Sequence, residues 1–238
     1  MEPKPGAALT GAMVVLTLTA GMVEAVSFIV LGPVFTAVQT GNLLFLGFAV
    51  AGEGGFSPAA SSVSLGGFAV GAVLGVRLES GLDSRGRPWF PVALGAEAAL
   101  LGLAGVVAWG IDRVGAPLSG RHYAVTALVA VAMGMRNVTT MRARVPDLPT
   151  TVATRAMTAF LGSTPLAVDT RIPAGARSQG RRSASVGAMF AGGLLGAWML
   201  HEEVRPAVVL LAVAGGVLAV GVGYGVARGG GRGVPEPG

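Results

Sequence analysis

Six long apolar runs limit what this chain can fold into more than any other feature of its sequence. They cover roughly residues 7–31, 59–77, 90–110, 121–141, 184–201 and 206–227. About 20 predominantly apolar residues are enough to cross a lipid bilayer as an α-helix. Only 12% of the 238 residues are charged, whereas a soluble domain carries about 25%. The sequence therefore predicts an all-α membrane protein with six transmembrane helices.

These spans use up most of the chain and leave no room for a separate soluble domain. We expect one integral membrane domain over residues 1–227, followed by a disordered cytoplasmic tail over residues 228–238, which has nothing to bury. The first apolar run continues far beyond the apolar region of a signal peptide. It is therefore expected to be a retained helix.

Two further stretches do not read as ordinary spans. The first covers about residues 33–52 and contains "TAVQTGNL", and the second is "TTVATRAMTAFLG" at 150–162. Proline precedes each of them, and proline removes a backbone donor and disfavours helix in the residue before it. Both are expected to be broken or re-entrant segments. A first segment that spans, giving seven helices, remains an alternative.

The two unusual stretches occupy matching places in an internal repeat. "GMVEAVSFIVLGPVFTAVQTGNLLFLG", from Gly21, aligns with "GMRNVTTMRARVPDLPTTVATRAMTAFLG", from Gly134. "GGFAVGAVLG", ending at Gly75, matches "GAMFAGGLLG", ending at Gly196, in its glycine spacing. We interpret the chain as two halves, about 7–110 and 121–227. Three spans per half make the second half inverted, while chance similarity between Gly- and Ala-rich helices is the alternative.

The polar groups of the two segments are the candidate binding site. Non-helical backbone at membrane depth needs protein or water to satisfy it, and interrupted segments at corresponding positions of two halves indicate a transporter's binding site. The alternative is that these groups only bond to neighbouring helices. The candidate substrate-binding residues are Glu24, Thr36, Gln39, Thr40, Gly41, Asn42, Asn137, Thr150, Thr151, Thr154 and Arg155.

Four ionisable residues lie within or beside apolar stretches, where charge is costly and usually functional. Glu24 is deep enough that it must pair or carry a proton. Arg155 takes the repeat position of Gly41 and could meet Glu24 or an anionic substrate. Arg136 is expected to extend to the inner membrane interface, and Glu97 remains ambiguous.

Several function classes are not expected. The chain has no cysteine, which excludes thiol chemistry, and its basic residues are scattered without interleaved aromatic residues, which argues against nucleic-acid binding. No nucleophile elbow, H-E-x-x-H motif or phosphate loop is present, and the two histidines lack ligand-spaced partners, so we expect no enzyme, no metal and no cofactor. The expected partners are membrane lipids and an unidentified small molecule or ion, and a homo-oligomer remains open.

The paired motifs also carry a family resemblance. "TAGMVEAVSFIVLGPVFTAVQTGNLLFLG" together with "AMGMRNVTTMRARVPDLPTTVATRAM" resembles the YoaK-like family of bacterial multi-pass membrane proteins, over about residues 7–225. Arg155 departs from the glycine that the family pattern has there. The resemblance implies a multi-pass protein of the bacterial inner membrane and no established activity. We expect a small-molecule or ion transporter or channel, with a membrane scaffold or accessory subunit as the alternative.

Charge placement predicts the orientation of the termini. With six spans, the basic loops and both ends of the chain fall on one side of the membrane, which the positive-inside rule makes the cytoplasm. Reporter fusions at the two termini should therefore both report a cytoplasmic location. Termini on opposite sides would exclude six spans.

Overall fold

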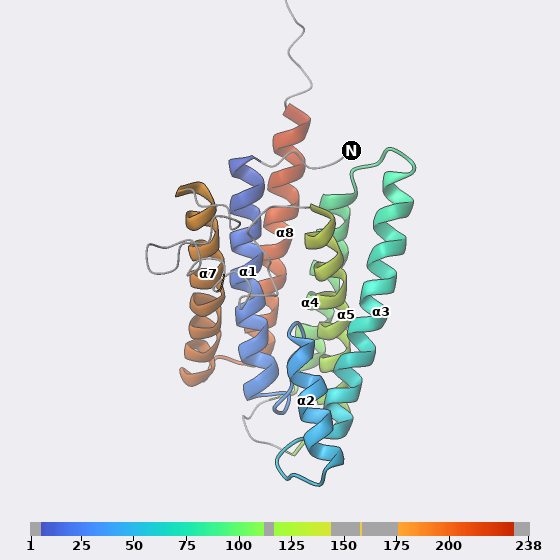
Figure 1. Cartoon of the computed structure of the whole chain (residues 1–238), viewed down its shortest axis with the longest axis vertical. Coiled ribbons are helices and arrows are strands. Elements are labelled where there is room, and N and C mark those ends of the chain that lie inside the picture. The colour runs from blue at the N-terminus through green and yellow to red at the C-terminus, as the bar shows by residue number, and fades with distance from the viewer. Residues whose placement is uncertain (1–5, 112–116, 144–157, 159–175, 231–238) are drawn as a thin grey trace, which may run out of the picture.

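The computed structural model describes residues 6–111, 117–143, 158 and 176–230. These residues form helices and no strands, and six of the helices are long and apolar enough to cross a membrane, as predicted. Figure 1 shows them side by side in one bundle. The helices are α1 (Ala7–Ile29), α2 (Gln39–Val50), α3 (Pro58–Asp83), α4 (Trp89–Ala108), α5 (Gly120–Ala143), α7 (Ala176–His201) and α8 (Pro206–Gly230).

The six long helices alternate in direction. Arg142, near the end of α5, bonds to Asp83 at the end of α3 and lies 5.2 Å from the ring centroid of Trp89 at the start of α4. At the opposite end, Arg205 lies 5.7 Å from the ring centroid of Trp109. The beginning of α1 and the end of α8 lie at the same end of the bundle (Figure 1). An even number of crossings is the result.

Helix α2 is re-entrant. The end of α1, the loop after α2 and the start of α3 all lie at the lower end of the bundle (Figure 1), so the chain between α1 and α3 enters and leaves there. Its 12 residues span about 18 Å, too little for the roughly 30 Å hydrocarbon core. The structure thus decides between the two predictions for residues 33–52: they re-enter and do not make a seventh span. The second segment, 150–162, lies outside the described residues apart from Thr158.

Local sequence explains the turns around α2. Gly32, in the turn that follows α1, has φ +97°, a left-handed conformation that L side chains rarely adopt. Before α3, the Ser57 side chain accepts a hydrogen bond from the Ala60 N–H at 3.1 Å, and Pro58 follows it at the first helical position. These signals place a turn after α1 and a new helix start at α3, and the short helix α2 lies between them.

Glycines bring two pairs of helices into close contact. A methyl group on Gly71 of α3 would lie 2.0 Å from the carbonyl oxygen of Val131 in α5, and one on Gly192 of α7 would lie 1.9 Å from that of Leu18 in α1. Backbones that approach this closely gain packing that lipid cannot supply. The α3–α5 and α1–α7 pairs therefore depend on the absence of a side chain at these glycines.

We predict that Gly71→Ala and Gly192→Ala each destabilise the protein by about 1–3 kcal/mol, because the backbones must move apart. Gly66→Ala in α3 and Gly187→Ala in α7 are matched controls, since a methyl group there meets nothing within 4 Å. The controls should be neutral or slightly stabilising. Thermal unfolding in detergent measures the difference, and equal effects in both sets would contradict this packing.

Candidate functional site

The carboxylate of Glu24 holds the backbone of the re-entrant segment. Its Oε1 accepts hydrogen bonds from the N–H groups of Thr36 at 3.2 Å, Val38 at 3.3 Å and Ala37, while Oε2 accepts a second bond from Thr36 at 3.3 Å. Glu24 itself is 7% exposed. Three successive donors ahead of α2 would otherwise be buried without partners, which is costly. Glu24 therefore allows the helix to break inside the bundle.

Asn42 and Ser64 hold the segment from its other side. The Asn42 side chain accepts from the Phe35 N–H at 2.9 Å and donates to Gln39 Oε1 at 2.7 Å and Ser64 Oγ at 3.1 Å. Ser64, in α3, donates to the Phe35 carbonyl at 2.6 Å, and Gln39 donates to the Thr36 carbonyl at 2.8 Å. Asn42 and Ser64 are fully buried. The segment is thus bonded to α1 and to α3.

The structure brings only part of the predicted site together. Glu24, Thr36, Gln39 and Asn42 share one network, in which Thr36 Oγ1 also lies 3.0 Å from Ser27 Oγ. Thr40 is exposed. A methyl group on Gly41 would lie 2.6 Å from the ring of Phe35, so the glycine makes room for that ring.

The remaining predicted residues lie elsewhere or cannot be placed. Asn137 is in α5, where its side chain donates to Met141 Sδ at 3.8 Å. The other four predicted residues lie outside the described part of the chain: Thr150, Thr151, Thr154 and Arg155.

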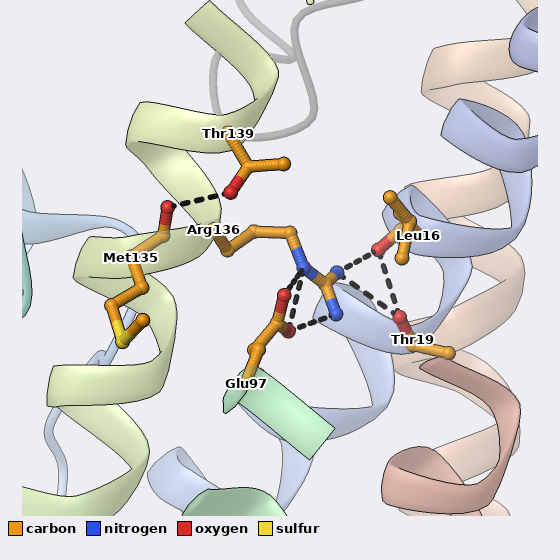
Figure 2. Close-up of polar contacts among 6 residues, drawn as sticks. All are labelled: Leu16, Thr19, Glu97, Met135, Arg136 and Thr139. Carbon is orange, nitrogen blue, oxygen red and sulfur yellow. Dashed lines mark hydrogen bonds and ion pairs between the residues drawn. The ribbon is translucent and has the colours of Figure 1, made fainter. Parts of the chain in front are cut away.

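A second polar cluster lies near the middle of the bundle. Arg136 Nε donates to the two oxygens of Glu97 at 2.7 and 2.9 Å, and its Nη2 forms an ion pair with Glu97. Nη1 donates to the Leu16 carbonyl at 2.5 Å and to Thr19 Oγ1 at 3.1 Å. Figure 2 shows the guanidinium between Glu97 on one side and Leu16 and Thr19 on the other. Arg136 thereby ties α5 to α4 and α1.

The sequence-based interpretation of Arg136 was wrong. We expected its side chain to extend to the membrane interface, but it is 0% exposed, with Glu97 at 1%. A carboxylate within reach on α4 and a backbone acceptor on α1 make the interior the better place for this cation. Two opposite charges in separate apolar runs were the signal that could have suggested the pair. No sequence signal identified Ser64 or Thr19 as part of these clusters, because serine and threonine are common within membrane helices.

The arrangement suits a membrane protein with internal polar structure. A charged pair joins three helices at mid-depth, and a broken segment enters from one end. Such features mark substrate pathways or stabilise helix packing.

A family model described as "Protein of unknown function (DUF1275)" matches residues 12–223. The chain belongs to this family. The match takes in α3, α4, α5 and α7 completely and most of α1 and α8, and it agrees with the uncharacterised family that the sequence motifs resemble. Neither a curated protein nor a solved structure matches the chain. Family membership therefore supports a multi-span membrane protein and leaves its activity to be inferred from the site.

We predict that Arg136→Met destabilises the protein by about 3–5 kcal/mol, because it leaves Glu97 charged and buried without its partner. Adding Glu97→Leu should recover most of that loss, since a buried apolar pair often replaces a buried ion pair without cost. Arg142→Met is the control, because its ion pair with Asp83 is about 30% exposed and should be worth at most about 1 kcal/mol. A double variant no more stable than Arg136→Met would contradict this assignment.

Proposed function

We propose that this protein is a transporter or channel for a small molecule or ion. The observation that carries the proposal is the break between α1 and α2, where three backbone donors converge on the buried Glu24. A broken segment inside a membrane bundle is costly, and transporters use such segments to line binding sites. The proposed partners are this solute and the surrounding lipids.

We also propose that the two halves form an inverted repeat, and the glycine contacts support it. The glycine-spacing match described above pairs Gly71 with Gly192. The match that starts at Gly21 and Gly134 pairs Leu18 with Val131 when it is extended three residues toward the N-terminus. Gly71 contacts Val131 and Gly192 contacts Leu18. The contact between α3 and α5 is thus the repeat equivalent of the contact between α7 and α1.

A second set of contacts supports the same relation. A methyl group on Gly134 would lie 2.2 Å from the Phe68 carbonyl oxygen, and one on Gly21 would lie 2.5 Å from the Met189 carbonyl oxygen. Phe68 and Met189 are equivalent in the same alignment. α1 and α5 are also the two most buried spans, and α3 and α7 the two least buried. Since α1 and α5 run in opposite directions (Figure 1), a repeat relating them is inverted.

The inverted repeat extends the proposed site to the second segment. Asn137 takes the position of Glu24, so it would hold a segment entering from the opposite end of the bundle. The residues of that segment, Thr150, Thr151, Thr154 and Arg155, would then complete the site with Thr36, Gln39, Thr40, Gly41 and Asn42.

The distribution of charge supports an orientation. One end of the bundle carries Arg85, Arg87 and Arg142 with Asp83, whereas the other carries Glu53, Glu202 and Glu203 with Arg121 and Arg205, so the first end is the more basic one. By the positive-inside rule, the first end faces the cytoplasm of a bacterial inner membrane, with both termini there.

One observation favours a scaffold or accessory subunit as the second candidate. Glu24, Asn42 and Ser64 each bond to groups within the chain, as polar side chains do when they only fix helices to one another. A scaffold needs no exchange of solute at these groups. An uptake measurement therefore separates the two functions.

We predict that vesicles containing the protein take up at least one compound from a panel of inorganic ions, amino acids, carboxylic acids and sugars, above the level of empty vesicles. Glu24→Gln should reduce this uptake several-fold, because it removes the charge while Oε1 still accepts the backbone bonds. Glu53→Gln, in the exposed loop after α2, is the control and should leave uptake unchanged. A Glu24→Gln protein that loses stability but keeps full uptake would contradict the proposal, and no uptake across the panel would favour the scaffold.

We predict that an experimental structure including residues 144–175 will superpose the halves by rotation about an axis in the membrane plane, placing "TAVQTGNL" on "TTVATRAM". Superposition about the membrane normal would overturn the inversion and keep the duplication.

A further inference from the structure

The face of α3 that packs against α5 ends in a buried carboxylate. Gly67, Gly71 and Gly75 make the close contacts with α5, and Glu79 follows one turn later with 0% exposure. One more turn along, Asp83 bonds to Arg142 near the basic end of the bundle. Glu79 is therefore one helical turn inside the surface ion pair, between two helices.

Glu79 is only half satisfied. Its Oε1 lies 2.5 Å from Thr139 Oγ1 of α5, and its Oε2 is buried and has no hydrogen-bond partner among the residues that the structure describes. The same Thr139 hydroxyl lies 3.1 Å from the carbonyl oxygen of Met135 (Figure 2). A buried carboxylate oxygen without a donor is rare, since an unpaired charge inside a membrane protein is costly.

Glu79 can be ionised or protonated, and the two states differ in the hydrogen bonds that they allow. The Thr139 hydroxyl has one hydrogen and can donate either to Glu79 or to the Met135 carbonyl. If Glu79 is ionised, its Oε1 accepts the Thr139 hydrogen, the Met135 carbonyl loses that donor, and Oε2 remains charged without a hydrogen-bond donor. If Glu79 carries a proton on Oε1, it donates to Thr139, and Thr139 donates to Met135. The second arrangement satisfies both contacts and leaves Oε2 a neutral carbonyl oxygen.

The charged groups around Glu79 do not replace a proton. Arg142 is the cation that acts on it electrostatically, but its guanidinium is engaged by Asp83 and by Ser80 Oγ at 3.2 Å. Arg136, also on α5, is turned toward Glu97, the one charged residue of α4. Helix α2 carries no charge, and the remaining charge of α3, Arg77, is exposed.

The other half shows that packing alone does not require this polar pair. In the repeat alignment, Glu79 corresponds to Leu200 and Thr139 to Val26. Both are buried apolar residues. An apolar pair would therefore fit the geometry of this contact, and the carboxyl group at Glu79 calls for another reason.

We propose that Glu79 is a proton-binding site, protonated in this conformation, and that it exchanges its proton with water at the basic end of the bundle. On release, the Oε1–H bond breaks, the proton passes to water and the carboxylate turns toward Arg142. One part of this proposal rests on the proposed transport function: proton binding and release at Glu79 would couple the movement of a solute to protons. Within the described part of the chain, no three His, Asp or Glu side chains gather to hold a metal ion instead.

Infrared difference spectroscopy of the full chain in vesicles tests the site without a solute. We expect the carbonyl band of a protonated carboxylic acid that shifts in heavy water, is lost in Glu79→Gln and fades reversibly as pH rises. Glu53→Gln, in the exposed loop after α2, should keep the band. A second variant, Glu79→Leu with Thr139→Val, copies the apolar pair of the other half and should fold with unchanged thermal stability while losing the band.

Three results would overturn the proposal: no band lost in Glu79→Gln, a band that persists at every pH at which the protein stays folded, or a carboxylate signal that responds to added sodium and not to pH. Because the spectrum needs no solute, its failure leaves the uptake proposal intact. If the pH-dependent band is found and is lost in Glu79→Gln, but no uptake is measured, the proton site stands and transport is rejected.

Discussion

The absence of water in a bilayer core is the constraint on which this structure depends. Each backbone N–H placed there must find a partner within the protein. Six long helices meet this condition by themselves, but the chain between α1 and α2 does not. Glu24 accepts the N–H groups of Thr36, Ala37 and Val38, and the Asn42 side chain satisfies Phe35. The re-entrant segment therefore exists because acceptors on α1 and α2 replace the missing helical ones.

The same constraint explains how the long helices are joined. Where lipid is as apolar as a side chain, helices associate through close backbone contact and through internal polar bonds. Gly71 and Gly192 provide the first, and Arg136 with Glu97 provides the second by linking α5 to α4 and α1. Glycines thus bring the backbones of two pairs of helices together, and the charged link at mid-depth connects α5 of one pair with α1 of the other.

The sequence allowed the fold to be predicted better than the site. Apolar length predicts the six spans, and Pro33 with the polar groups after it indicates a broken segment, because both signals are local. The partners of Arg136 and Glu79 lie on other helices, and their burial depends on packing that no single stretch encodes. The network at Glu24 was predicted in part, since its members are close in sequence, whereas Ser64 belongs to the next helix.

The most direct test of this account is the side of the membrane on which the loop after α2 lies. The chain has no native cysteine, so single cysteines at Gly54, after α2, and at exposed Ser84, after α3, can be labelled by an impermeant thiol reagent in vesicles of known orientation. Re-entry predicts that Ser84→Cys is labelled on the side of the N-terminus and Gly54→Cys on the opposite side. Labelling of Gly54→Cys on the side of the N-terminus, with Ser84→Cys opposite, would show that the segment spans and would contradict the account.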